Sequence, residues 1–229
     1  MKVAVVFPEL LGTYGDGGNA LALAWRARAR QISVSVQEVH LGDEFPDADL
    51  YLLGGGEDGP QRLATERLRE VGFADRVREG ARLLAVCAGL QVVGRHFAVE
   101  GDDTFPGLDL VPAVTVRGTP RAVGDIAVRV GSRLLVGFEN HGGRTSLGEG
   151  LSPLGEVVSG TGNDGRVDGY RAPGIWGTYL HGPVLAQNPW WCDEILSELV
   201  GEPLAPLESV ADRLYAARVR EVTGRESAS

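Results

Sequence analysis

The first hundred residues contain four short apolar runs that alternate with segments of helical periodicity. The runs, which are too short to be amphipathic helices, cover residues 2–7, 32–39, 49–53 and 82–86. Helices are predicted between and after them, at residues 20–30, 60–71, 73–78 and 89–97. Asn19 is expected to cap the first helix, and Gly72 separates the second from the third. Short buried strands that alternate with helices predict a parallel α/β sheet.

The pattern changes between Leu108 and Thr178, where short strands are separated by Gly and Pro and helical periodicity is missing. The strands are predicted at residues 110–116, 125–130, 134–136, 156–158, 166–170 and 175–178. No linker separates this segment, so we expect a β-rich extension of the same sheet. Helices return at 189–200 and 208–221. We therefore predict one domain over residues 1–200, followed by a C-terminal helix and a frayed tail over 201–229.

Composition excludes several classes of protein. The chain has 22 Lys and Arg against 31 Asp and Glu, a formal net charge of −9, which argues against a nucleic-acid partner because phosphate binding needs a basic face. Two cysteines do not make a disulfide framework and favour a reduced compartment. No apolar stretch reaches the roughly 18 residues that a membrane span needs. We expect a cytoplasmic protein that is not an integral membrane protein.

Cys87 follows the apolar run 82–86 directly and precedes a predicted helix. A reactive residue between a strand and a helix, followed by the small residues Ala88 and Gly89, is typical of a nucleophile elbow, here with Cys in place of Ser. The turn lifts the sulfur above the sheet, and the helix N-terminus favours the thiolate. The backbone N–H of Ala88 is placed to stabilise an oxyanion. The sequence therefore predicts that Cys87 is a nucleophile rather than a buried structural cysteine.

A thiol nucleophile needs a base, and the chain has four histidines. His40 ends a predicted strand and is interpreted as a surface residue. His96 lies nine residues after Cys87 on the same predicted helix, which is too far away for a base. His141 and His181 both lie in predicted Gly-framed loops after apolar strands, where catalytic loops emerge. The pattern alone does not choose between them.

A run of three glycines, Gly54 to Gly56, follows the third apolar run. Its backbone amides can approach a ligand closely, which favours an oxyanion-binding turn over a plain β-turn. The run lacks the Gly-Lys-Ser/Thr ending of a phosphate-binding loop, so no nucleotide site is expected on this chain. Arg117 and Arg121 lie between two predicted strands, and either is suited to bind a substrate carboxylate. Asp16, in YGDGGN, is interpreted as a turn residue.

Three segments, LLGGGEDGPQ, VCAGLQVVG and GTYLHGPVLAQNP, together resemble the class I glutamine amidotransferases. The CobB/CobQ-like branch resembles the chain best because of the GFENHGG and YLHG segments. The resemblance implies a flavodoxin-like three-layer sandwich of class I amidotransferase topology. It implies hydrolysis of L-glutamine to glutamate and ammonia through a cysteine thioester.

The resemblance assigns roles residue by residue. Cys87 matches the nucleophile and His181 the base. Gly55 and Gly56 match the oxyanion turn that works with Ala88. The substrate-binding residues by the same match are Gln91 and Arg121. The acid that usually stands two residues after the histidine is replaced by Pro183. The orienting carboxylate is therefore either missing, which would leave a Cys–His dyad like that of the CobB/CobQ-like branch, or it comes from elsewhere. Turnover is expected to be slow until a partner orders the site.

Within this branch, the chain resembles glutaminase subunits that supply ammonia to a Mur-ligase-like synthetase in peptidoglycan biosynthesis. The implied partner forms a heterodimer with the chain, binds ATP and Mg, and amidates D-glutamate of lipid II. No cofactor and no metal are expected on this chain. Two alternatives stay open: a stand-alone γ-glutamyl hydrolase or cysteine peptidase of the same fold, and a non-enzymatic binding module that keeps the elbow as a relic.

Overall fold

The computed structural model describes residues 1–99 and 103–226, with side chains through Val222. The first of its two sheets has six strands in the order β11, β12, β4, β3, β1 and β2. Their bounds are β1 Lys2–Val6, β2 Ser35–Val39, β3 Leu50–Leu53, β4 Arg82–Val86, β11 Tyr170–Ala172 and β12 Ile175–Thr178. All pairs are parallel except β11 with β12. The central strands are buried on both faces, which is why they appear in the sequence as unbroken apolar runs.

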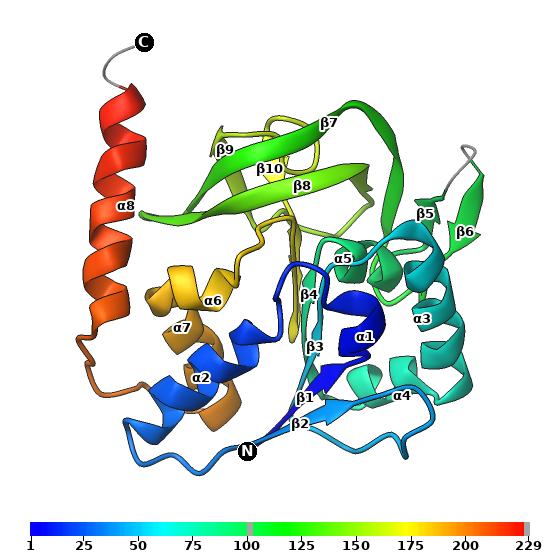
Figure 1. The fold of residues 1–229 in the computed structure, drawn as a ribbon, viewed down its shortest axis with the longest axis horizontal. Helices are drawn as coiled ribbons and strands as arrows, with labels where there is room; N and C mark the ends of the chain where they lie inside the picture. The colour runs from blue at the N-terminus through cyan, green and yellow to red at the C-terminus, as the bar shows by residue number, and fades with distance from the viewer. Residues whose placement is uncertain (100–102, 227–229) are drawn as a thin grey trace.

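Helices cover both faces of this sheet (Figure 1). Helices α2 (Gly18–Arg28), α6 (Val184–Gln187) and α7 (Pro189–Val200) lie on one face. The opposite face is covered by α1 (Pro8–Leu11), α3 (Asp58–Glu70), α4 (Phe73–Arg78) and α5 (Ala88–Val93). The predicted three-layer α/β sandwich is confirmed. Asn19, however, is not a cap: Gly17 precedes the helix, and Asn19 Oδ1 accepts the Leu185 N–H at 2.9 Å, joining α2 to α6.

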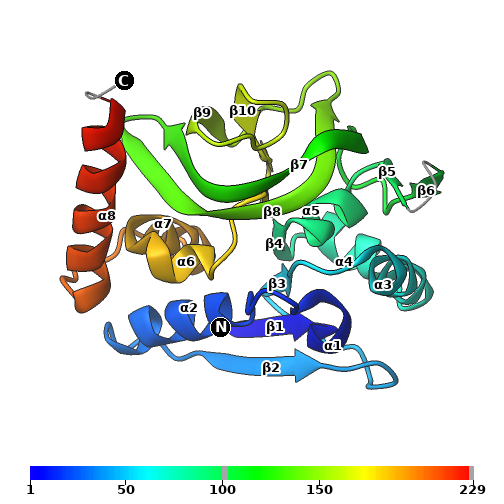
Figure 2. The same ribbon diagram turned by 45° about the horizontal axis from the view of Figure 1, so that its top comes forward.

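Most of the β-rich segment forms a second sheet, so the prediction that it extends the first sheet holds only for its end. Its strands are β5 His96–Ala98, β6 Thr104–Pro106, β7 Ala113–Val130, β8 Arg133–Leu147, β9 Gly155–Ser159 and β10 Val167–Asp168. The long antiparallel pair β7–β8 arches over the first sheet (Figure 2). Only β11 and β12 return to the first sheet. His96 therefore begins a strand of the second sheet and is not on the elbow helix.

The two sheets meet at His181. The His181 N–H donates to the Phe138 carbonyl of β8 at 2.7 Å, and the Phe138 N–H donates back at 3.4 Å. This bridge fixes the backbone of His181 just beyond the end of β12. Because β3, β4 and β12 are parallel, Gly54, Cys87 and Tyr179 all emerge at the same edge of the first sheet. The site lies at that edge, because open α/β sheets bind their ligands at the carboxyl ends of the strands.

The C-terminal helix α8 (Val210–Glu226) packs against β8, α6 and α7. The Tyr215 hydroxyl donates to the Leu134 carbonyl at 2.8 Å. A buried guanidinium, that of Arg26 on α2, donates to Asp193 of α7 at 2.6 Å and to Asp212 of α8 at 3.2 Å. Three helices are thus joined through one charged group. No described helix is long and apolar enough to cross a membrane.

Candidate active site

Cys87 occupies a strained turn between β4 and α5. Its φ of 52° and ψ of −105° lie in a region that residues other than glycine rarely adopt. The turn is held by two backbone hydrogen bonds, from the Cys87 N–H to the Thr178 carbonyl and from the Gly89 N–H to the Gly54 carbonyl. A Cβ on Gly89 would lie 2.7 Å from both the Cβ and the carbonyl oxygen of Leu53. The small residue after the elbow is therefore a packing requirement, and the geometry is that of a nucleophile elbow.

His181 lies beside Cys87 and is 1% exposed. Its Nδ1 lies 3.3 Å from Oδ2 of Asp16, and that carboxylate oxygen also accepts the Gly55 N–H at 2.8 Å. The buried Nε2 has no hydrogen-bond partner among the described residues, and the Cys87 side chain lies close enough to the ring to act on its pKa. The arrangement is a Cys87–His181–Asp16 series. Asp16 is 3% exposed and is not the simple turn residue that the sequence predicted.

The pKa of His181 is raised to about 10. Burial by itself would lower it, but hydrogen bonds and charge interactions with Asp16 and Cys87 more than offset burial. A histidine with this pKa keeps its proton at neutral pH. An imidazolium beside a cysteine sulfur stabilises the thiolate, which is the reactive form of a cysteine nucleophile.

Two further groups fix the imidazole ring. The ring of Tyr14 lies against it, with a centroid separation of 4.4 Å. On another side, a Cβ on Gly55 would lie 2.5 Å from Cε1 of His181. Gly55 thus gives the ring its space and gives Asp16 a hydrogen bond. Because its N–H already donates to Asp16, Gly55 is not available as the predicted oxyanion donor.

The remaining predicted oxyanion donors are Gly56 and Ala88. Among the described residues, neither amide N–H has a hydrogen-bond acceptor. Both residues line the same cleft as Cys87. Ala88 is also the first residue of α5, so its N–H is one of the unpaired donors at the start of a helix. The pair is placed to bind an oxygen that becomes negative when the thiolate attacks a carbonyl carbon.

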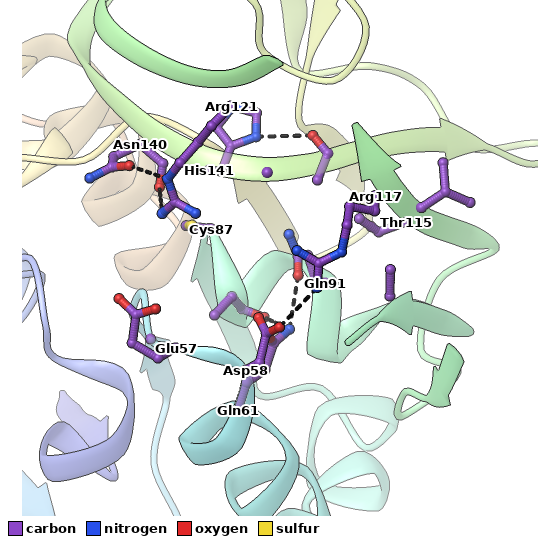
Figure 3. A pocket seen from close by; sticks show the side chains of 16 residues that line it. Glu57, Asp58, Gln61, Cys87, Gln91, Thr115, Arg117, Arg121, Asn140 and His141 are labelled. Atoms are coloured by element: carbon purple, nitrogen blue, oxygen red, sulfur yellow. Dashed lines mark hydrogen bonds and ion pairs between the residues drawn. The ribbon is translucent and has the colours of Figure 1, made fainter. Parts of the chain in front are cut away.

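A cleft with an empty volume of about 510 Å³ opens above Cys87 (Figure 3). Its floor includes Gln91, whose side chain is held on both sides: Oε1 accepts from Gln61 at 2.9 Å, and Nε2 donates to the Tyr179 hydroxyl at 3.2 Å. Gln91 therefore lines the cleft, and its substrate-binding role stays a prediction. Its amide is engaged in a buried network that makes the floor rigid.

Both arginines predicted in a loop lie instead on β7 and line the cleft. Arg121 donates to the Asn140 side chain at 2.7 Å and to the Asn140 carbonyl at 3.2 Å (Figure 3). Arg117 is paired with Asp58 at 3.1 Å. Arg121 is thus the cleft arginine without a carboxylate partner among the described residues. This difference favours Arg121 over Arg117 as the carboxylate-binding residue.

His141 also differs from the prediction, because it lies within β8 and not in a loop. It is 2% exposed and stacks on Tyr179 with ring centroids 3.7 Å apart. Its ring nitrogens lie 3.0 Å from the Gly143 carbonyl and 3.2 Å from Glu139. Burial tends to raise the pKa of Glu139, but hydrogen bonds from His141 and from the Gly162 and Thr161 amides lower it overall. Both ring nitrogens of His141 have partners other than Cys87, which favours His181 over His141 as the base.

Sequence reasoning missed Asp16 and Tyr14, which the fold brings to His181 from the segment after β1. One signal for them was present: YGDGGN follows a strand parallel to β3 and β4, so it had to emerge at the same sheet edge. Glu57, which directly follows the Gly54–Gly56 run and lines the cleft, was also missed.

The fold limits what such a thiol can do. A parallel sheet that ends in a cysteine elbow, with a protonated histidine and free amides at the sulfur, is suited to acyl transfer at a carbonyl or amide carbon. The class is therefore a cysteine-dependent acyl-transfer enzyme. Residues 2–189 match the CobB/CobQ-like glutamine amidotransferase domain, and the chain belongs to this family.

Curated relatives lie in the same family. The chain is 36% identical over 210 residues to "Lipid II isoglutaminyl synthase (glutamine-hydrolyzing) subunit GatD" of Staphylococcus aureus, covering 87% of this chain and 86% of that protein. The protein of the same name from Streptococcus pneumoniae is 32% identical, with 82% and 76% covered. Cobyric acid synthase of Pelotomaculum thermopropionicum is 31% identical, but the chain spans only 37% of its length.

Solved structures share the fold at lower identity. A glutamine amidotransferase structure aligns with a TM-score of 0.60 and 22% identity, covering 87% of this chain and 98% of that one. A chain of the structure of PurLQS from Thermotoga maritima aligns with a TM-score of 0.58 and 13% identity, covering 87% and 95%. The amidotransferase fold is thus shown by structure as well as by sequence.

Proposed function

We propose that this chain is the glutamine-hydrolysing subunit of a lipid II isoglutaminyl synthase. The observation that carries the proposal is the Cys87–His181–Asp16 series, whose cysteine lines an open cleft, in a chain whose relatives named for this activity align over most of their length. The substrate of this site is L-glutamine. The products are glutamate and ammonia.

In the first half of the reaction, the Cys87 thiolate attacks the side-chain amide carbon of glutamine. The carbonyl oxygen becomes an oxyanion, which accepts hydrogen bonds from the amides of Gly56 and Ala88. When the C–N bond breaks, the His181 imidazolium gives its proton to the leaving nitrogen, and ammonia departs. The acyl group remains on sulfur as a γ-glutamyl thioester, and Asp16 keeps the ring oriented throughout.

In the second half, water attacks the thioester carbon. His181, now neutral, takes a proton from that water, and the same two amides stabilise the second oxyanion. The C–S bond breaks, glutamate leaves, and the thiolate–imidazolium pair is restored. Each proton that His181 gives is thus recovered within one turnover.

The ammonia would be used by a Mur-ligase-like synthetase subunit bound to this chain as a heterodimer in the cytoplasm. That subunit would bind ATP and Mg and activate D-glutamate in the lipid II stem peptide, which ammonia converts to D-isoglutamine. The names of the two relatives, both subunits of a synthase, support this assignment.

Transfer of ¹⁵N from glutamine to lipid II tests the proposal. The chain would be co-expressed with the Mur-ligase-like protein of the same organism, and the purified pair supplied with ATP, Mg, lipid II and glutamine labelled with ¹⁵N in its amide. We expect labelled lipid II from the wild-type pair and none from Cys87→Ser, because the hydroxyl is a much weaker nucleophile. Ammonium salts should restore amidation in that variant. A chain that ignores this protein and hydrolyses glutamine at full rate alone would instead be a stand-alone hydrolase.

A further inference from the structure

Two opposite charges face the cleft on either side of Cys87 without being paired to each other (Figure 3). One is Arg121 on β7, and the other is Glu57 at the end of the glycine run. Both lie close enough to the Tyr14 hydroxyl to act on its pKa, which burial and Glu57 raise and Arg121 opposes. Among the described residues, no basic group lies within salt-bridge distance of Glu57, and no carboxylate lies within that distance of Arg121.

The other ionisable side chains at the cleft, apart from the nucleophile, already have partners. Arg117 is paired with Asp58 at 3.1 Å, and His141 lies 3.2 Å from Glu139. The uncompensated pair is therefore one cation and one anion beside the nucleophile. A free amino acid carries the complementary pair of charges on a single α-carbon.

We propose that Glu57 binds the α-ammonium group of glutamine while Arg121 binds its α-carboxylate. The inference rests on the proposed glutaminase function and identifies the substrate class as a free amino acid. Only three carbon–carbon bonds separate the amide carbon from the α-carbon of glutamine, so both charged groups must lie near Cys87. The order of residues along the chain fits this requirement. The amide of Gly56 faces the developing oxyanion, and the next residue, Glu57, carries the carboxylate that would bind the α-ammonium group.

This arrangement makes the α-amino group a specificity determinant. Glutaramate, which has the same amide and carboxylate but lacks the amino group, would leave the carboxylate of Glu57, which is exposed in the free chain, without a partner in the occupied cleft. Sites built to bind a polar group reject analogues that lack it for this reason. Glutamine within a peptide or with an acylated nitrogen would be rejected too, since its nitrogen carries no charge.

Steady-state kinetics of the assembled enzyme test the inference. Glu57→Gln should raise KM for glutamine about 10- to 100-fold, the loss of one charge-assisted hydrogen bond, with a much smaller change in kcat. Glu57→Asp should recover part of that loss because the charge is kept. Asp58→Asn is the matched control, since the adjacent carboxylate is already neutralised by Arg117, and it should leave KM for glutamine unchanged.

The ratio of kcat/KM for glutamine to that for glutaramate gives the second readout. Wild type should prefer glutamine strongly, and Glu57→Gln should lose most of that preference. An unchanged KM and an unchanged ratio in Glu57→Gln would overturn the assignment of Glu57 while leaving the glutaminase intact. Failure of the wild-type enzyme to hydrolyse glutamine at all would instead refute the proposed function.

Discussion

Replacing Asp16 by Asn should move the alkaline limit of glutaminase activity to lower pH. Asp16 faces Nδ1 of His181 at 3.3 Å, and it is one of two groups that raise the histidine pKa to about 10. Asn has nearly the same shape and can still accept the Gly55 N–H, but it carries no charge. The substitution therefore tests the charge of Asp16 more than its packing.

The size of the shift follows from the hydrogen bond that is weakened. A hydrogen bond to a charged group contributes about 1.5–3 kcal/mol, and about 1.4 kcal/mol corresponds to one pKa unit. Loss of the charge should thus lower the His181 pKa by about 1–2 units. Activity falls when His181 loses the proton that it gives to ammonia, so the alkaline limb of kcat/KM should move from near pH 10 to about pH 8–9.

The assay is the pH profile of kcat/KM for glutamine with the assembled complex. Tyr14→Phe is the control, because it keeps the ring that lies against His181 and should leave the limb in place. An alkaline limb that does not move in Asp16→Asn would refute the role of Asp16 as the orienting acid. An equal loss of kcat/KM at every pH in Asp16→Asn would show that Asp16 only supports the fold.

The same linkage acts on stability. Because the folded-state pKa of His181 is raised above its usual value, its favourable contribution is complete below about pH 6.5 and is lost as pH rises toward 10. The free energy of unfolding should therefore decline over that window. The decline should be smaller in Asp16→Asn, and urea denaturation at several pH values measures it.

Five other substitutions test neighbouring parts of the site. His181→Ala should lower kcat by at least about 100-fold, whereas His141→Ala should reduce stability more than the rate, since both its nitrogens hold structure; kinetics and thermal melting of the two variants decide this. Arg121→Ala should raise KM for glutamine more than Arg117→Ala does. If neither substitution changes KM, neither arginine binds the substrate. Gly55→Ala should nearly abolish activity, because its Cβ would lie 2.5 Å from the His181 ring; a fully active variant would show that the ring position does not matter.

The first sheet and the elbow could be predicted because they depend on local sequence. Parallel strands buried on both faces must be continuous apolar runs, and β1, β3 and β4 are found within a residue or two of the predicted positions. The elbow needs a small residue where Gly89 packs on Leu53, so its pattern is visible too.

The second sheet could not be predicted in the same way. Residues 117–122 contain Gly and Pro and resemble a loop, yet they belong to β7 because β8 pairs with it along most of its length. Pairing with a partner strand overrides local preference, and a register shift between Arg117 and Ala122 absorbs the irregular residues. The same pairing explains why His141 lies in β8 where the sequence predicts a loop.

The acid that orients His181 is separated from it by 165 residues. Its identity depends on how the segment after β1 crosses the sheet edge, which no local pattern specifies. The sequence leaves two alternatives, a missing carboxylate or one from elsewhere, and the contact of Asp16 with His181 favours the second. An orienting acid within this chain removes the reason to expect slow turnover without a partner. Dependence on a partner stays a prediction that must rest on other contacts.

The most direct test of the account is covalent labelling of the nucleophile by a glutamine analogue. Intact-mass and peptide mass spectrometry would follow the complex after treatment with 6-diazo-5-oxo-L-norleucine, an electrophile that carries the α-amino and α-carboxylate groups of glutamine. We predict one adduct per chain, on Cys87 and not on the buried Cys192, with labelling slowed by glutamine and strongly reduced in Asp16→Asn at pH 9. Labelling of another residue, or an unlabelled Cys87 in a complex that still hydrolyses glutamine, would contradict the central claim.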